Sequence, residues 1–326
     1  MTWLAVRQYR VQIAVMLIAA GLLAIGMAFA AVYVAGVRTE LGLDSCVPLP
    51  NTNLNCVQLD MEWRRRTGSL NYLFYALYVL PGLVASYVGG PLFAVEFERG
   101  THRLAWTQGV SRVRWAALKL GVVLVATLAA SIMLAPFGGG QKEFLGKTVV
   151  SPFETFEIQG PALVSYFVFG LAAGALIGAW TRRVLAGMLV GLLVLAVLRV
   201  GVHNLRPAYQ APVIAEYPYS AGPFQSSFDI APGAWVVGGD AIDLEGRAVP
   251  PERVTSLMQE YFRTPRQLGP TSNDATYLRE HGVIRRLLYQ PADRFWTFQL
   301  IEAAIFGELA AVCALLTLWR VRSSDA

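Results

Sequence analysis

Charged residues are scarce in this sequence, and so are cysteine and histidine. Only 15% of the 326 residues are charged and 55% are hydrophobic, whereas soluble domains carry about 25% charged residues. The mean hydropathy is +0.46, so the composition indicates a membrane protein before any span is located. In a membrane protein, basic residues indicate which segments face the cytoplasm, so the net charge of +5 is interpreted as a sign of topology. We expect no nucleic-acid partner.

Motifs for metal, nucleotide or hydrolytic chemistry are also missing. His102, His203 and His281 are far apart, and neither CxxC nor HExxH spacing occurs. Gly146–Thr148 reads GKT, but the P-loop pattern requires a glycine where Gln141 stands. No GxSxG elbow is present. We therefore expect no catalytic site, no metal site and no cofactor in this chain, so that any ATP hydrolysis must be supplied by another protein.

Long apolar runs dominate what remains. A helix needs about 20 apolar residues to cross about 30 Å of hydrocarbon. Six segments reach this length, the last two with ionisable residues inside. The predicted spans are residues 11–37, 70–95, 116–137, 160–181, 184–205 and 295–319. The first run is too long for a signal peptide and lacks a clear cleavage site, so the sequence predicts an all-α polytopic protein with six transmembrane helices.

The remaining segments complete the organisation. Thr2–Arg10 has the aromatic and arginine pattern of a short interfacial helix, so residues 1–205 hold that helix and five spans. Residues 206–294 form a small outer α/β-type subdomain, and residues 295–326 hold the sixth span and a tail.

The outer subdomain contains ten prolines but also enough aromatic residues for a core. Within it, Pro251–Arg263 and Ala275–Tyr289 are expected to be helices. Trp235–Gly246 is expected to be a hairpin that turns at Gly238 and Gly239.

The distribution of basic residues predicts that both termini are cytoplasmic. With this orientation the short inner segments carry Arg7, Arg10, Arg99, Arg103, Arg112, Arg114, Lys119, Arg182, Arg183, Arg320 and Arg322. The outer loops around the second and third spans carry fewer: Arg38, Arg64, Arg65, Arg66, Lys142 and Lys147. The bias obeys the positive-inside rule, although the Arg64–Arg66 run opposes it.

The cysteines agree with this orientation. Cys46 and Cys56 share the first outer loop, where an oxidising environment favours a disulfide over two free thiols. Cys313 lies inside the last span and suits apolar packing.

Glycines recur at every fourth residue of the fourth and fifth spans: Gly170, Gly174, Gly178, Gly187 and Gly191. This spacing leaves one smooth face on each helix and predicts close helix packing. The alternative is a contact that slides during transport.

Arg199, Glu302 and Glu308 are ionisable residues within or near the last two spans. Such residues usually face a bundle interior or a water-filled cavity. Arg199 either extends toward the interface or pairs with Glu302 to hold two helices together; alternatively, the three residues line a polar substrate path.

The connection Phe93–Trp115 is unusually charged for a link between two spans. It mixes acidic and basic residues with tryptophan and leucine. Arginine and aromatic side chains are common anchors of protein interfaces, which favours a protein partner; an interfacial helix on lipid is the alternative.

Gly89–Leu120 resembles the permease subunits of type-2 ABC exporters, in particular an actinobacterial group. The residues that carry the resemblance are an acidic pair, E-x-G-T-H-R-L-A-W-T-Q, an S-R-x-R-W motif and a lysine. In this sequence they are Glu96, Glu98, Gly100 to Gln108, Ser111, Arg112, Arg114, Trp115 and Lys119. Tyr289–Phe306 is similar to the same group's approach to its last span.

The resemblance implies an exporter that works as a dimer with a second permease, either the same chain or a homologue. Two copies of a cytosolic ABC ATPase, which bind ATP and Mg, would dock on the connection after the second span. The residues implied in coupling are Glu96, Glu98, Arg99, Gly100, Thr101, His102, Arg103 and Trp106. Few buried charges suggest a hydrophobic or amphipathic substrate, and membrane lipid is the remaining partner.

Two other functions remain open from the sequence. One is an ABC-like complex that extracts a molecule or relays force without full transport. The other is a membrane-anchored receptor or enzyme that acts through residues 206–294. Co-purification with an ATPase that carries Walker motifs would separate a transporter from a receptor, and activity of the outer subdomain would favour an enzyme.

Overall fold

The computed structural model describes residues 2–46, 54–101, 111–140, 151–218, 233–263 and 274–323. The chain forms two compact units. The first, here called the bundle unit, comprises Met1–Thr148, Thr155–Asn204 and Thr297–Ala326. The second, the sheet unit, comprises Val149–Glu154 and Leu205–Trp296.

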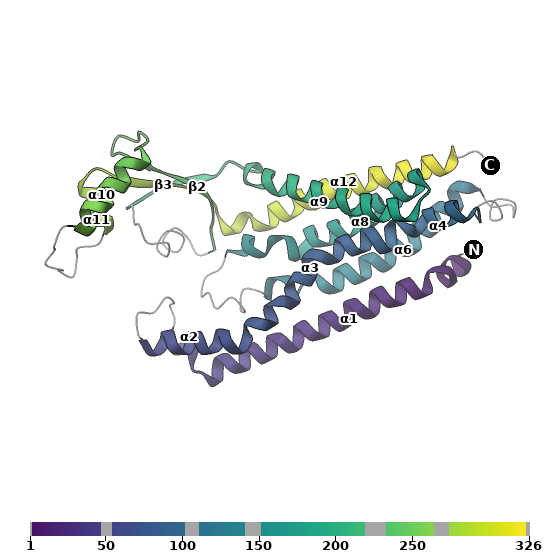
Figure 1. Ribbon diagram of the computed structural model, residues 1–326, viewed down its shortest axis with the longest axis horizontal. Coiled ribbons are helices and arrows are strands. Elements are labelled where there is room, and N and C mark those ends of the chain that lie inside the picture. The colour runs from purple at the N-terminus through teal and green to yellow at the C-terminus, as the bar shows by residue number, and fades with distance from the viewer. Residues whose placement is uncertain are drawn as a thin grey trace. The chain divides into compact units, whose positions relative to one another are not determined.

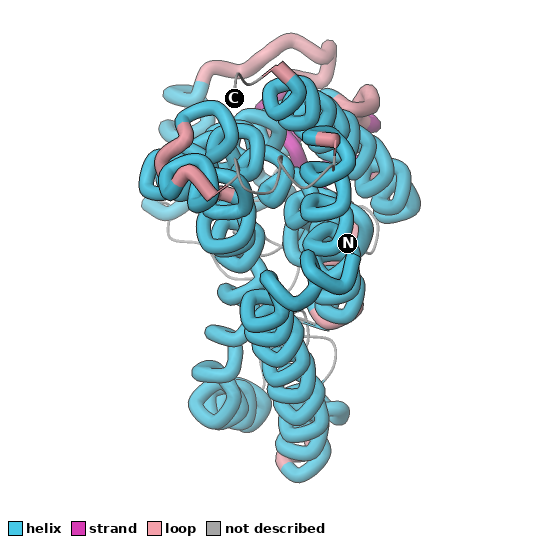
Figure 2. The backbone as a smooth tube through the Cα atoms, turned by 90° about the vertical axis from the view of Figure 1, so that its right-hand side faces the viewer, coloured by secondary structure: helices cyan, strands magenta, loops and turns pink. Residues whose placement is uncertain are grey.

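Six helical segments within the described ranges are long and apolar enough to cross a membrane, as the sequence predicts. These segments are Arg7–Glu40, Asn55–Arg99, Arg112–Gly140, Pro152–Thr181, Val184–Ala208 and Ala292–Arg322. Their main helices are α1 (Thr2–Glu40), α3 (Tyr72–Leu83), α6 (Arg112–Leu134), α8 (Gly160–Thr181), α9 (Val184–Leu205) and α12 (Phe295–Arg322) (Figure 1). Figure 2 looks along these helices, which are the dominant element of the bundle unit.

Helix α8 forms the centre of the bundle unit. It contacts α3, α4 (Pro91–Arg99), α6 and the short segment η3 (Val84–Gly89). Glycine and alanine make up much of α8, and its larger residues, among them Phe167 and Phe169, are also buried. A helix that is apolar on all sides must be enclosed by other elements, which explains why this span is the core.

Helix α1 runs without a break from Thr2 to Glu40. Its 39 residues give a length of roughly 58 Å, nearly twice the hydrocarbon thickness. The separate interfacial helix expected at Thr2–Arg10 is therefore not found; these residues form the first turns of α1. The physical reason is that neither proline nor glycine interrupts the sequence before Gly21.

The far end of α1 is fastened to helix α2 (Leu54–Thr67), which precedes α3. Cys46 follows α1 and forms a disulfide with Cys56 in α2, as the sequence predicts. Arg66 of α2 also lies 3.1 Å from Glu40 at the end of α1. Two links thus hold α1 and α2 together at this end.

The arginine run of α2 is matched by acidic residues on the same helix. Arg64 pairs with Asp60 and Arg66 pairs with Glu62, each at 2.7 Å and one helical turn apart. Arg65 pairs with Glu62 as well, at 2.8 Å. The run that opposes the positive-inside distribution is therefore largely balanced by neighbouring carboxylates.

The second span changes its helical form before it reaches the charged connection. After α3, residues Val84–Gly89 form a π-helix, η3, and the backbone nitrogen of Gly90 donates to the carbonyl oxygen of Ala85 at 2.9 Å. Pro91 then begins α4. Single π-helical turns inside α-helices occur frequently at functional sites, and this one sets the direction of α4.

The sheet unit contains three antiparallel strands in the order β1-β3-β2. They are β1 (Val213–Pro218), β2 (Trp235–Ile242) and β3 (Ile284–Gln290). Helices α10 (Pro251–Arg263) and α11 (Asp274–Glu280) pack against each other around Val254, Tyr277 and Leu278. The helix expected at Pro251–Arg263 is confirmed.

Two local expectations for the sheet unit are wrong. Gly238 and Gly239 do not form a hairpin turn; they lie inside β2, where a Cβ on Gly239 would come within 3.0 Å of the carbonyl oxygen of Arg286 on β3. Glycine is thus required for close strand approach. The helix expected over Ala275–Tyr289 ends at Glu280, because Gly282 adopts φ +74° and stops it before β3.

The chain turns after the end of β2, and Asp243 closes this turn. Its carboxylate accepts hydrogen bonds from the backbone nitrogens of Glu245 and Arg247 and from the Arg247 side chain, at 2.8 to 2.9 Å. These donors, led by the backbone nitrogen of Arg247, hold the pKa of Asp243 below its ordinary value. Gly246 completes the turn at φ +82°.

Candidate functional site

Three backbones meet at Gly90, directly before α4. A Cβ on Gly178 of α8 would lie 2.2 Å from the carbonyl oxygen of Gly90, and a Cβ on Gly187 of α9 would lie 2.9 Å from it. A Cβ on Gly174 would lie 2.3 Å from the carbonyl oxygen of Ala85. Only glycine fits at these positions, so α8, α9 and η3 pack at backbone contact.

The remaining two glycines of the pattern extend the same contact. A Cβ on Gly170 would lie 2.8 Å from the carbonyl oxygen of Pro81, and one on Gly191 would lie 3.1 Å from the Cα of Gly174. The structure therefore places all five predicted glycines where the second, fourth and fifth spans touch.

Glu96 of α4 points into the bundle unit and is buried. Its carboxylate forms an ion pair with the ammonium group of Lys119 on α6 and accepts a hydrogen bond from the amide nitrogen of Gln8 on α1. Lys119 is 3% exposed, and its Nζ atom lies 4.2 Å from the centre of the Trp115 ring. One carboxylate thus joins three spans.

A neighbouring contact strengthens this junction. The hydroxyl group of Tyr9 on α1 donates to the carbonyl oxygen of Leu92 at 3.0 Å. The start of α1 is therefore bonded to both the first and the second turn of α4, through Tyr9 and Gln8.

Glu98, in contrast to Glu96, binds the start of helix α9. Its Oε2 atom accepts a hydrogen bond from the backbone nitrogen of Val184, the first residue of α9, at 3.0 Å. Arg182, in the turn between α8 and α9, lies 5.5 Å from the centre of the Phe97 ring. It adopts φ 56°, a left-handed conformation that is uncommon outside glycine. The last turn of α4 therefore holds the turn that joins α8 and α9.

The residues that follow Glu98 lie on the surface. Arg99 ends α4, Gly100 turns the chain at φ 71°, and both are exposed together with Glu98 and Thr101. Glycine reverses the chain here without the cost that a Cβ would impose. The expected coupling residues His102, Arg103 and Trp106 lie outside the described residues.

The structure divides the expected coupling residues into two kinds. Glu96 is buried and bonded inside the chain, so in this structure it does not face a partner, and its part in coupling stays a prediction. Glu98, Arg99, Gly100 and Thr101 remain accessible.

Gln8 and the Val184 backbone were not singled out from the sequence, and Lys119 was named only as part of the resemblance, not as a partner of Glu96. Lys119 carried the clearest signal, since it follows Trp115 by one helical turn, within reach of the same apolar face.

A second polar cluster lies toward the other end of the spans. Arg199 of α9 donates to the carbonyl oxygen of Tyr78 at 2.7 Å, and its Nη2 atom lies 3.0 Å from Oε2 of Glu157 without hydrogen-bond alignment. Nδ1 of His203 lies 2.6 Å from the same carboxylate. The carboxylate paired with Arg199 at this distance is thus Glu157, which the sequence pattern did not reveal.

Glu302 is linked to Arg199 through an aromatic ring. The guanidinium group of Arg199 lies 4.6 Å from the centre of the Tyr166 ring, and the Tyr166 hydroxyl group donates to Glu302. Glu302 is fully buried, whereas Glu308 lies on the exposed face of α12. The three ionisable residues therefore do not converge on one path within the described structure.

Within the described ranges, no three histidine, cysteine or acidic side chains come close enough to hold a metal ion. The polar residues that do gather there form charge pairs and contacts between helices.

Six spans, a central glycine contact and a charged connection bonded to several helices define a multi-pass membrane protein. Residues 12–206 match the family described as ABC-2 membrane transporter related. The match covers more than half of the 326 residues, and the chain belongs to this family. Membership supports a transporter permease and implies, in general terms, an ABC transporter with an ATPase partner. No curated protein and no solved structure matches the chain.

Proposed function

We propose that this chain is the membrane-spanning permease subunit of an ATP-driven exporter of the bacterial plasma membrane. Two copies of a cytosolic ATPase, carrying ATP and Mg, drive a dimer of this chain or a pair with a homologous permease. The motif of Gly89–Leu120 supports an actinobacterial-like group of such exporters.

The bonding of α4 is the observation that carries this proposal. Its exposed end presents Glu98, Arg99 and Thr101, while Glu96 and Glu98 bond its body to α1, α6 and α9. A force on the exposed end is therefore passed to three other spans through hydrogen bonds and an ion pair. A passive loop would not need this many internal links.

The composition of the end of the bundle unit that carries these links supports an orientation with both termini in the cytoplasm. The first turns of α1, the end of α4, the start of α6 and the turn between α8 and α9 share it, as the contacts of Gln8, Lys119 and Val184 require. These segments are rich in arginine, so the positive-inside rule supports a cytoplasmic location. A C-terminal fluorescent-protein fusion that folds only in the cytoplasm tests this location.

A substrate of hydrophobic or amphipathic character suits the bundle unit. The described helices that surround α8 enclose mostly apolar side chains, and the buried charges are bonded to one another or to polar groups of the chain. A polar substrate would meet few hydrogen-bond partners along such a bundle.

Purification of the tagged chain from membranes, followed by mass spectrometry, tests the ATPase partner. We expect a protein with a P-loop to co-purify, and its ATP turnover to rise in the presence of this chain. Arg99→Glu, at the exposed end of α4, should abolish the rise without reducing insertion, and Arg103→Glu in the same connection should act alike. Arg322→Glu, an exposed arginine at the end of α12, is the matched control.

Two results would contradict the proposal. One is a purified complex without any P-loop ATPase, which would favour a receptor or enzyme that acts through the sheet unit. The other is unchanged ATP turnover in both Arg99→Glu and Arg103→Glu.

A further inference from the structure

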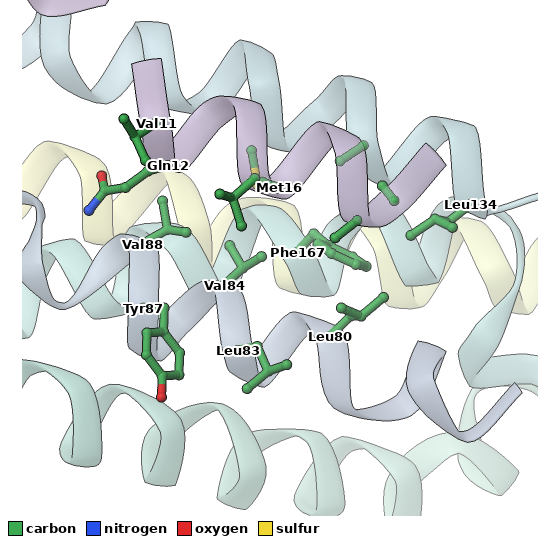
Figure 3. Close-up of a pocket in the computed structure, with 14 residues that line it drawn as sticks. Val11, Gln12, Met16, Leu80, Leu83, Val84, Tyr87, Val88, Leu134 and Phe167 are labelled. Carbon is green, nitrogen blue, oxygen red and sulfur yellow. The ribbon is translucent and has the colours of Figure 1, made fainter. Parts of the chain in front are cut away.

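A cleft opens in the side of the bundle unit between α1 and the second span (Figure 3). Its volume is about 330 Å³. Val84, Leu134 and Phe167 are buried and form its floor, whereas Val15 on the rim is 62% exposed. The opening therefore faces sideways, toward the surroundings of the spans, and not along their axes.

The lining of the cleft is apolar except at one end. Figure 3 shows Gln12 at that end and Leu134 at the opposite end, with the hydroxyl group of Tyr87 directed away from α1. Gln12 is two residues from Arg10 and belongs to the first turns of α1, beside the basic end of the bundle unit. The cleft thus has a polar entrance near the membrane interface and an apolar interior.

The depth of the cleft matches one leaflet of a bilayer. Its lining on α1 extends from Val11 to Ala20, and on the second span from Leu80 to Val88. Eight or nine residues of helix measure about 12–14 Å, and half of the hydrocarbon thickness is about 15 Å. A hydrocarbon chain that enters beside Gln12 would therefore fill the cleft and end near the middle of the membrane.

We propose that this cleft binds one acyl chain of a membrane lipid, drawn from the leaflet at the end that bears the termini, with the lipid's polar group beside Gln12. The inference rests on the membrane location of the spans and not on ATP coupling, so the two proposals can fail separately.

Size and polarity distinguish an acyl chain from other occupants. Water gains few hydrogen bonds in a cavity with this lining. An acyl chain is a slender hydrocarbon, whereas an α-helix with its side chains is about 10 Å across and would lie over the opening rather than inside it. An empty cleft would forfeit dispersion contacts, whereas an acyl chain supplies them and is the most abundant apolar group in the surroundings.

The packing of the second span explains why the cleft exists. η3 lies against α8 and α9 through the glycine contact at Gly174 and Gly191, while the hydrogen bonds from α1 to α4 lie beyond it, at Leu92 and Glu96. Between these contacts, side chains of α1 and of the second span line the cleft.

The test uses the full chain in nanodiscs that contain a phospholipid with a photoreactive diazirine on its acyl chain. After illumination, labelled peptides are mapped by mass spectrometry at increasing fractions of this lipid. We expect labelling of the cleft residues to saturate, as at a site of fixed capacity. Labelling around Val125, an exposed residue of α6, should rise in proportion to the lipid fraction.

Two tryptophan substitutions on α1 complete the experiment. Ala19 lines the cleft and is exposed, so Ala19→Trp fills the space without entering the core and should reduce cleft labelling at least five-fold. Ala28 is also exposed on the same helix but lies outside the cleft, and Ala28→Trp should leave labelling unchanged.

Cleft labelling that rises in proportion to the lipid fraction, as at Val125, would overturn the proposal, because the lipid would then be ordinary boundary lipid. Labelling unaffected by Ala19→Trp, or absent because a second copy covers the cleft, would overturn it as well. If Ala19→Trp lowers the folded yield, the unsubstituted chain provides the test: saturating labelling of the cleft supports the proposal and proportional labelling overturns it. None of these measurements requires ATP or an ATPase.

Discussion

Glu98, in the last turn of α4, accepts a hydrogen bond from the backbone nitrogen of Val184, the first residue of α9. The first backbone nitrogens of a helix have no partner inside that helix, and here a carboxylate from another span supplies one. The same carboxylate is favoured by the positive end of the helix dipole of α9. The charged connection and the fifth span are therefore linked at their ends.

Replacement of Glu98 by alanine should loosen the start of α9. A hydrogen bond contributes about 1 kcal/mol net, so opening of the first turn should become about five-fold more frequent. Hydrogen exchange measured by mass spectrometry should show faster exchange in residues 184–187. Arg99→Ala, one residue further on, is the control. Equal exchange in Glu98→Ala and the control would mean that the bond does not hold α9.

The pair formed by Glu96 and Lys119 should behave as a unit. Removal of one partner leaves a buried charge unpaired, which costs about 3–5 kcal/mol, so Lys119→Met and Glu96→Gln should each lower the thermal unfolding temperature. The double substitution should recover much of the loss, because neither charge remains.

An exposed pair provides the comparison for this cycle. Arg64 and Asp60 on α2 are one helical turn apart, and their side chains are 53% and 22% exposed, so their coupling energy should be at most about 1 kcal/mol. If the losses in unfolding temperature of Glu96→Gln and Lys119→Met simply add in the double variant, the two residues do not stabilise the chain as a pair.

The six spans could be predicted from the sequence because length and hydropathy alone define a membrane helix. The disulfide could also be predicted from the sequence, because Cys46 and Cys56 lie in one loop between two spans. These features depend on local composition, and no knowledge of the packing is required to find them.

Features that depend on tertiary packing were harder to predict. The acidic pair of the connection looked alike in sequence, yet Glu96 turns inward to Lys119 while Glu98 stays at the surface. That difference arises from the direction of α4 after η3, and a π-helical turn has no clear sequence signature. In the sheet unit, Gly239 resembles a turn glycine but serves close strand pairing with β3.

The glycine contact leads to a sharp comparison between two alanine substitutions. A Cβ on Gly178 would lie 2.2 Å from the carbonyl oxygen of Gly90, whereas nothing lies within 4 Å of a Cβ on Gly26 of α1. Gly178→Ala should therefore destabilise the chain by about 1–3 kcal/mol, the usual cost of overpacking. Gly26→Ala should be neutral or slightly stabilising, since alanine favours helix. Equal unfolding temperatures for the two variants would show that the spans separate readily at Gly90.

Charge exchange at Arg199 distinguishes between its two candidate carboxylates. Nη2 of Arg199 lies 3.0 Å from Oε2 of Glu157, so Arg199→Glu places a second negative charge beside Glu157. The folded yield in detergent, measured by size-exclusion chromatography, should therefore fall. Adding Glu157→Arg should restore part of that yield because the pair is re-formed with reversed sign. Recovery will be partial, since the hydrogen bond from Arg199 to the Tyr78 carbonyl group is still lost. Adding Glu302→Arg instead should help less, because the Tyr166 ring lies between the two positions. Better rescue by Glu302→Arg would show that these residues form the direct pair expected from the sequence.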